Sequence, residues 1–143
     1  MIRKLFSKYK EQISYLFFGG LTTLVNWIVY TISLKVFGIT LEISNVLAWL
    51  IAVIFAYITN KLFVFESKNL NFIFTLKELG LFFASRITSG IIEIFGFPFL
   101  YYIGLNQSLF GIDGFVAKAF ISIIVIILNY IFSKLIVFKK RNN

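Results

Sequence analysis

The stretch that decides the fold is residues 115–138, which read FVAKAFISIIVIILNYIFSKLIVF. After Lys118 it carries no charge until Lys134. As an α-helix it would extend about 36 Å at ~1.5 Å per residue, which exceeds the ~30 Å of hydrocarbon in a bilayer. We therefore predict that residues 115–138 form a transmembrane helix.

Three further runs have the same length and apolar character, at residues 13–34, 43–65 and 79–103. The 143-residue chain is 59% hydrophobic and only 14% charged, so a water-soluble domain of this size would lack enough polar surface to cover itself. The first run continues without a small-residue cleavage site, so we expect a retained helix and not a signal peptide. The sequence predicts an all-α integral membrane protein, with four transmembrane helices in a single domain, residues 1–143.

The charges point to a membrane and not to nucleic acid. The net charge is +8, but the basic residues form short clusters between apolar runs, as juxtamembrane anchors do. Eleven of them would lie on one side of the membrane: Arg3, Lys4, Lys8, Lys10, Lys61, Lys68, Lys77, Lys134, Lys139, Lys140 and Arg141. Lys35 alone would lie on the other. The positive-inside rule then predicts cytoplasmic N- and C-termini. Residues 71–78 are expected to form a short amphipathic segment along the inner surface.

An internal two-helix repeat is visible. Residues 57–65, YITNKLFVF, align 73 residues later with residues 130–138, YIFSKLIVF. Residues 16–18 and 81–83 match more weakly. Two spans per unit would give the halves the same orientation, related by a pseudo-two-fold axis along the membrane normal. The alternative is a chance likeness between apolar helices.

The chain contains no Cys and no His. This excludes disulfides and thiolate metal sites, and it removes the commonest general base and metal ligand. We predict that the protein has no cofactor and is not an enzyme.

Each predicted span has one face of polar or small residues at steps of three or four. The small members of these faces are read as close helix contacts. They are Gly19, Ala48, Ala52, Ala56 and Gly90.

The charged members need another explanation, because a charge at mid-bilayer costs at least ~2.5–3.5 kcal/mol. Arg86 would lie ~10 Å from the inner end of its helix. Glu93 lies two turns further, and Lys118 enters from the outer end at nearly the same depth. We predict a Glu93–Lys118 ion pair, with Arg86 lacking an acidic partner. The set is either a structural pair beside a carbonyl-solvated arginine or an anion site in the membrane.

Depth sorts the candidate substrate-binding residues into two tiers. Asn60, Arg86 and Asn129 fall in the cytoplasmic half, and Asn26, Glu93 and Lys118 fall in the outer half. A guanidinium suits phosphate oxygens, while an amide can both donate to and accept from sugar hydroxyls. Lys61 and Lys134, equivalent in the repeat, would lie at the inner headgroups, either as ordinary anchors or to capture a lipid phosphate.

These residues resemble the GtrA-like family of small four-helix membrane proteins. The resemblance is carried by YLFFGG at 15–20, NKLFVF at 60–65 and NYIFSK at 129–134, together with Asn26, Arg86 and Lys118. It implies a flippase in the bacterial cell membrane that moves a polyprenyl-phosphate-linked sugar, typically undecaprenyl-phosphate-glucose, to the outer leaflet. The sugar would then decorate teichoic acid, O-antigen or another surface glycan. The resemblance also singles out Phe65, with Ala56 and Val64 as packing positions.

The expected partners are the lipid-linked sugar, membrane lipids and membrane glycosyltransferases. A homo-oligomer is plausible because four helices enclose little volume. Two other functions stay open. One is a non-transporting scaffold for a glycosyltransferase; the other is a small multidrug exporter, although the span 13–34 lacks the acid that such exporters carry there. A membrane glycosyltransferase is disfavoured, because Asp113 is the only outer-loop Asp and no paired-carboxylate metal motif exists.

Overall fold

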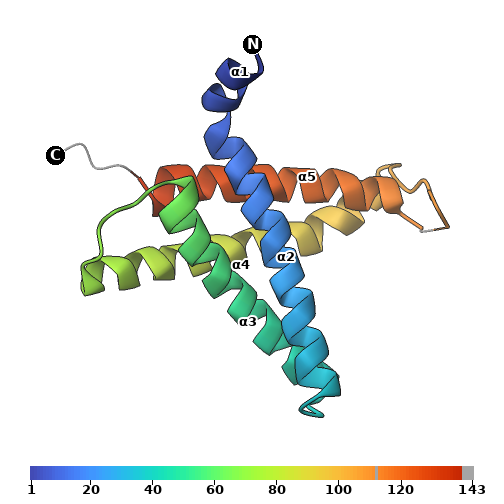
Figure 1. Ribbon diagram of the computed structural model, residues 1–143. Coiled ribbons are helices and arrows are strands. Elements are labelled where there is room, and N and C mark those ends of the chain that lie inside the picture. Colours follow the sequence, from blue (N-terminus) through green and yellow to red (C-terminus); the bar gives the residue numbers. More distant parts are fainter. Residues whose placement is uncertain (112, 140–143) are drawn as a thin grey trace. The chain divides into compact units, whose positions relative to one another are not determined.

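The computed structural model describes residues 1–111 and 113–139, and within them it contains helices and no β-strand. The elements are α1 (Ile2–Lys8), α2 (Lys10–Lys35), α3 (Leu41–Thr59), η1 (Asn60–Val64), α4 (Phe72–Tyr102), α5 (Phe115–Phe132) and η2 (Ser133–Val137), shown in Figure 1. Four stretches are long and apolar enough to cross a membrane: Lys10–Lys35, Ile43–Val64, Phe72–Tyr102 and Phe115–Val137. The predicted all-helical membrane fold with four spans is confirmed. Lys140 and Arg141, counted above for orientation, lie outside the described residues.

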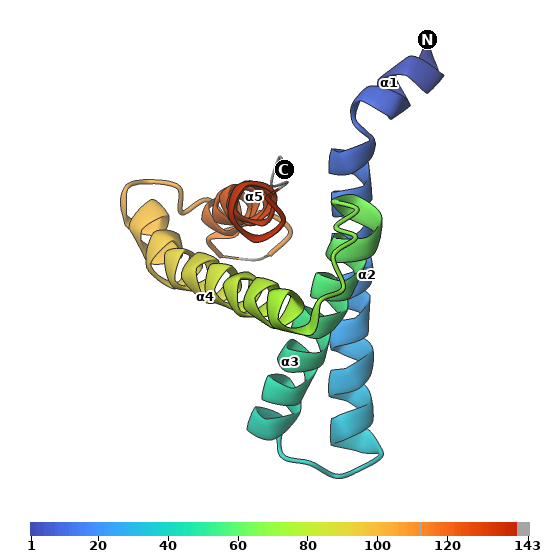
Figure 2. The same cartoon turned by 90° about the vertical axis from the view of Figure 1, so that its left-hand side faces the viewer.

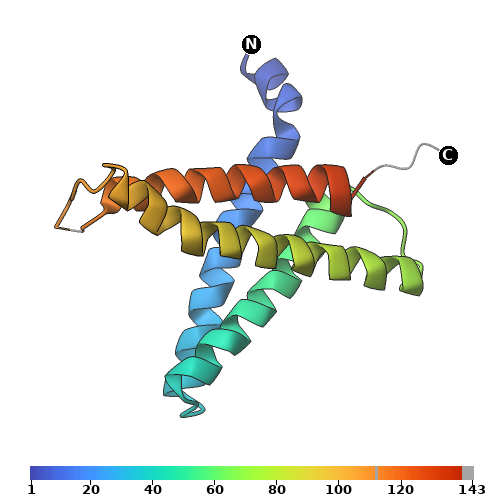
Figure 3. The same cartoon turned by 180° about the vertical axis from the view of Figure 1, so that it is seen from behind.

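The chain divides into two helical units, residues 1–70 and 71–143. In the first unit, α2 and α3 run antiparallel and lie side by side (Figures 1 and 2). In the second, α4 and α5 form the same kind of hairpin (Figures 1 and 3). Each unit is therefore one pair of membrane-spanning helices.

Both hairpins end in a short π-helix. In η1 the carbonyl of Asn60 accepts a hydrogen bond from the Phe65 N–H at 2.9 Å, and in η2 that of Ser133 accepts from Phe138 at 2.8 Å. The five-residue span of these bonds is the wide turn that defines a π-helix. The two π-helices begin 73 residues apart, at matching places in YITNKLFVF and YIFSKLIVF. This match favours a true repeat over a chance likeness.

The third span begins earlier than predicted. We expected residues 71–78 to lie on the membrane surface and the helix to start at 79, but α4 is continuous from Phe72. The side chain of Asn71 caps it, since Oδ1 accepts hydrogen bonds from the N–H groups of Ile73 (3.1 Å) and Phe74 (3.2 Å). The predicted start of the third helix at residue 79 is therefore wrong, because residues 72–78 continue the same helix.

Close approach of α4 and α5 depends on glycine. A Cβ on Gly96 would lie 2.6 Å from Cδ1 of Ile121, and one on Gly114 would lie 2.9 Å from the Tyr101 ring. Gly114 also needs its freedom at a φ of +66°, where it caps α5.

Of the predicted small-residue contacts, the alanines are close contacts within their hairpin and the glycines are not. A Cβ on Gly19 or Gly90 would meet nothing within 4 Å. The alanines Ala48, Ala52 and Ala56 are buried as predicted.

Candidate functional site

The second unit carries an ion pair between its spanning helices. Lys118, near the start of α5, donates to Oε1 of Glu93 on α4, so the predicted pair is present in the structure. The Lys118 ammonium also lies 5.9 Å from the centroid of the Phe97 ring. The side chains of Lys118 and Glu93 are 56% and 34% exposed, so the pair remains open on one side to an approaching group.

Arg86 is held by an aromatic ring and not by an acid. Its guanidinium carbon lies 4.7 Å from the centroid of the Phe82 ring, within the range of a cation–π interaction. Phe82 is fully buried, and its ring centroid lies 6.1 Å from that of Phe138. This packing holds in place the Phe82 ring, the aromatic platform on which the Arg86 guanidinium lies. Within residues 1–111 and 113–139, Arg86 makes no ion pair, as predicted. Its N–H donors are therefore available to an anion.

Asn129 lies at the depth of Arg86. The contacts at Gly96 and Gly114 set the antiparallel register of α4 and α5. Continued along both helices at ~1.5 Å per residue, this register brings Arg86 level with Asn129 to within about one turn. A charged donor and an amide thus occupy the same depth of one hairpin.

Three polar side-chain atoms, two at the π-helices and one near the end of α5, are buried without a hydrogen-bond partner in the described part of the chain. They are Oδ1 of Asn60, Oδ1 of Asn129 and Oγ of Ser133. The Nδ2 of Asn60 donates to the carbonyl of Ala56 at 2.7 Å, which fixes the amide and leaves its oxygen orphaned. Leaving such an atom unsatisfied costs about 1–3 kcal/mol. Each of these atoms can accept a hydrogen bond that no donor in the described chain supplies.

Ser133 was not among the predicted binding residues. It is fully buried, and it occupies the place in the repeat that Asn60 occupies in the first unit. That equivalence was the signal in the sequence that could have identified it.

The two repeat-equivalent lysines have different surroundings. Lys61 is buried, at 4% exposure, and its ammonium donates to Oγ of Ser67 at 3.3 Å. Lys134 is exposed; its ammonium donates to the Tyr130 hydroxyl at 3.2 Å and lies 5.5 Å from the ring centroid. Lys134 is therefore the more accessible of the two ammonium groups.

Asn26 does not meet Asn60. The stacked rings of Phe18 and Phe63 fix the register of α2 against η1, with centroids 5.3 Å apart. Along α2, Asn26 then lies more than one turn beyond the level of Asn60. Asn26 is half-buried, and it stays a predicted substrate-binding residue of the outer half only.

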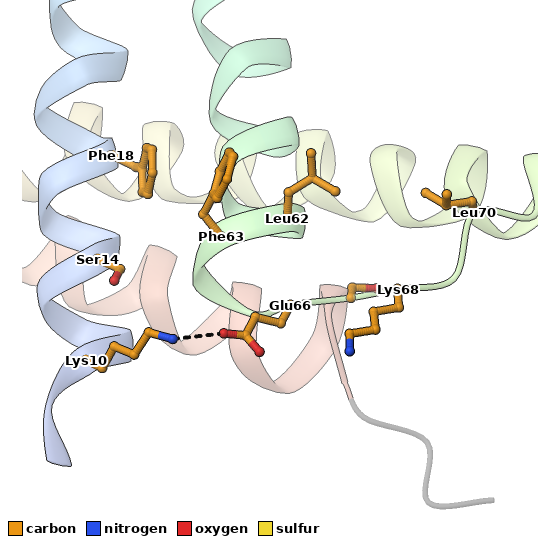
Figure 4. A pocket seen from close by; sticks show the side chains of 9 residues that line it. Lys10, Ser14, Phe18, Leu62, Phe63, Glu66, Lys68 and Leu70 are labelled. Atoms are coloured by element: carbon orange, nitrogen blue, oxygen red, sulfur yellow. Dashed lines mark hydrogen bonds and ion pairs between the residues drawn. The ribbon is translucent and has the colours of Figure 1, made fainter. Parts of the chain in front are cut away.

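The first unit contains a cavity of about 580 Å³ that the sequence did not predict (Figure 4). It lies between the start of α2 and the segment from η1 to the following loop. Its lining is Lys10, Ser14, Phe18, Leu62, Phe63, Glu66, Ser67, Lys68 and Leu70. Lys10 and Glu66 form an ion pair across it, with 3.1 Å between Nζ and Oε1. None of the eight predicted binding residues lines this cavity.

Spanning helices that carry an ion pair, an unpaired guanidinium and buried amides define a multi-pass membrane protein with polar groups inside its spans. The family model described as GtrA/DPMS, transmembrane domain, matches residues 14–138, and the chain belongs to this family. The family resemblance predicted from the sequence is thus confirmed. The family, its bacterial members and the four apolar helices place the protein in the bacterial cytoplasmic membrane.

Curated relatives cover nearly the whole chain. The cell wall teichoic acid glycosylation protein GtcA of Listeria innocua serovar 6a is 39% identical over 129 residues, which are 90% of this chain and 85% of that protein. GtcA of Listeria monocytogenes is 35% identical over 145 residues, or 96% of each chain. The membrane protein YwcD of Bacillus subtilis is 35% identical over 126 residues, covering 88% of this chain and 94% of its own length. No solved structure matches the chain.

Proposed function

We propose that this protein translocates a polyprenyl-phosphate-linked monosaccharide, such as undecaprenyl-phosphate-glucose, across the bacterial cytoplasmic membrane. The sugar would reach the outer leaflet for glycosylation of teichoic acid or another surface polysaccharide. The Listeria relatives are named as teichoic acid glycosylation proteins, which supports a role in that glycosylation. The observation that carries the proposal is Arg86, a guanidinium on a membrane-spanning helix with an aromatic platform and no acidic partner in the described chain.

A sugar phosphate cannot cross hydrocarbon unaided, because each unsatisfied polar group costs several kcal/mol. Arg86 offers a fork of N–H donors to phosphate oxygens. At the same depth, Asn129 offers an acceptor to a sugar hydroxyl, and Asn60 and Ser133 offer others at the π-helices. Lys118, paired with Glu93 but half-exposed, provides a second cation toward the predicted outer end. The protein moves its ligand without chemical change, so it acts as a carrier and not as an enzyme.

The decisive experiment is reconstitution of the purified protein into liposomes with labelled undecaprenyl-phosphate-glucose. Losing a hydrogen bond to a charged group costs about 1.5–3 kcal/mol, so Arg86→Ala should slow translocation by about 10- to 150-fold. Arg86→Lys should remain impaired, because a single ammonium cannot bind two oxygens as a fork. Arg3→Ala, which removes an exposed arginine outside the spans, is the matched control and should transport normally.

Full translocation by Arg86→Ala would refute the anion-site role of this residue. If the wild-type protein does not translocate the lipid but increases the activity of an added glycosyltransferase, the result would instead support the scaffold function.

A further inference from the structure

The cavity of the first unit lies at the end of its helices, not in their middle. Lys10 is the first residue of α2, and residues 66–70 form the loop after η1. Figure 4 shows the charged side chains of Lys10, Glu66 and Lys68 near this end, with Phe18 and Phe63 deeper along the helices. The cavity therefore has a charged mouth at the membrane boundary and an apolar floor within the span.

The charges at the mouth are incompletely matched. Glu66 is already engaged with Lys10 at 3.1 Å. The Lys68 ammonium is exposed, and no carboxylate in the described residues pairs with it. The lining thus carries two cations and one anion, an excess of one positive charge.

Glu66 is held in an uncommon backbone conformation, with a φ of +49°. A non-glycine residue in this left-handed region is rare and costs of order 1–3 kcal/mol. The conformation turns the carboxylate across the mouth toward Lys10 (Figure 4). A carboxylate would repel a ligand that offered only an anion, so its presence favours a ligand that also brings hydroxyl donors.

We infer that this cavity binds the headgroup of a polyprenyl-phosphate-linked sugar before translocation. The Lys68 ammonium contacts the phosphate, the Glu66 carboxylate binds sugar hydroxyls, and Phe18 and Phe63 contact the first apolar units of the chain. The volume of about 580 Å³ suits a small ligand. The choice of ligand rests on the proposed function, and the inference adds a separate capture site at the membrane boundary.

The chain has no cysteine, so a single one can report on occupancy. Ser14→Cys places a thiol in the cavity, and Ser7→Cys places one on α1, outside the cavity, as the matched control. Proteoliposomes containing undecaprenyl-phosphate-glucose, undecaprenyl phosphate without sugar, or phosphatidylglycerol alone are treated with a maleimide reagent. At a ligand level ten times Kd, occupancy leaves about one site in eleven free, so labelling of Ser14→Cys should slow about tenfold. Labelling of Ser7→Cys should not change.

Only the sugar-bearing lipid is expected to give full protection, and Lys68→Gln in the Ser14→Cys background should abolish it. Lys8→Gln, which removes a charge outside the cavity lining, should retain it. Equal protection by all three lipids, or by none, would overturn the inference. Translocation by wild-type protein is measured in parallel. Transport without protection refutes the capture site alone, whereas protection without transport supports the site and refutes the proposed carrier function.

Discussion

Exchanging the charges of Glu93 and Lys118 separates a structural ion pair from an anion site. Glu93 lies nine residues before the end of α4 at Tyr102, ~13 Å along the axis, whereas Lys118 lies three residues after the start of α5, ~5 Å along it. The long lysine side chain can reach the headgroups if its partner is lost, and the carboxylate cannot. Loss of Lys118 should therefore destabilise the protein more than loss of Glu93.

The depths set the expected magnitudes. An unpaired charge deep in the bilayer costs about 2.5–3.5 kcal/mol. Since 34% of the Glu93 side chain is exposed, we expect Lys118→Gln to lower the free energy of unfolding by about 2 kcal/mol, below that range. Glu93→Gln should cost less than about 1 kcal/mol, because Lys118 can extend toward the interface. The exchange Glu93→Lys with Lys118→Glu keeps the pair and should restore most of the stability.

Two assays then distinguish the roles. Unfolding by sodium dodecyl sulfate in mixed micelles, followed by circular dichroism, gives the stability of each variant. Translocation of labelled lipid-linked sugar in proteoliposomes gives its activity. If Lys118 is an anion site, the exchanged variant should be stable but slow, because its cation now lies on α4 and a carboxylate faces the exit. If the exchanged variant translocates the lipid at the wild-type rate, the pair is structural only. Equal losses of stability in the two single variants would refute the depth argument.

Three further predictions concern local structure. Gly114→Ala should lower the free energy of unfolding by about 1–3 kcal/mol, because the new Cβ would lie 2.9 Å from the Tyr101 ring and a φ of +66° strains a non-glycine residue. Gly90→Ala, which meets nothing within 4 Å, should not lower it, and equal effects of the two substitutions would contradict the contact. Asn71→Ala should lower the free energy of unfolding by about 1 kcal/mol and speed hydrogen exchange of the backbone amides in the first turn of α4. Unchanged exchange would disprove the cap. In a double-mutant cycle, Phe18→Leu and Phe63→Leu should show about 0.5–1.5 kcal/mol of coupling, and additive losses would refute the ring stack.

The spans and the charged pair followed from the sequence because simple physics determines them. Hydrophobic length fixes where a helix can cross a membrane. Antiparallel pairing of consecutive spans then brings residues of similar depth together, which predicted the Glu93–Lys118 pair. Glu93, the acid nearest to Arg86 along α4, is already engaged with Lys118.

Other features were beyond this reasoning. Hydropathy does not distinguish a π-turn from an α-turn, so the repeat predicted equivalent residues but not the two π-helices. The start of α4 was misplaced because Lys77 and Glu78 resembled a membrane boundary, yet Glu78 is only 3% exposed. The cavity depends on the left-handed backbone of Glu66, for which a non-glycine residue gives no signal.

The two units share a backbone design but place their charges differently. In the first unit, no charged residue occurs between Glu11 and Lys35 or between Glu42 and Lys61. Its charges lie at the two ends of the hairpin, and the cavity lies at the end that carries Lys10, Glu66 and Lys68. The second unit carries Arg86, Glu93 and Lys118 within its spans.

This asymmetry argues for successive weak sites in a carrier. A single strong anion site would hold its ligand, since passage requires binding that is favourable enough to enter yet weak enough to leave. Under the proposed function, the pair with Glu93 weakens Lys118 as an anion site, and the Glu66 carboxylate lines the same cavity as Lys68. Arg86, which no acid in the described chain pairs with, would then be the site that binds the phosphate within the span. Its loss should therefore slow translocation more than the loss of Lys68 or of Lys118.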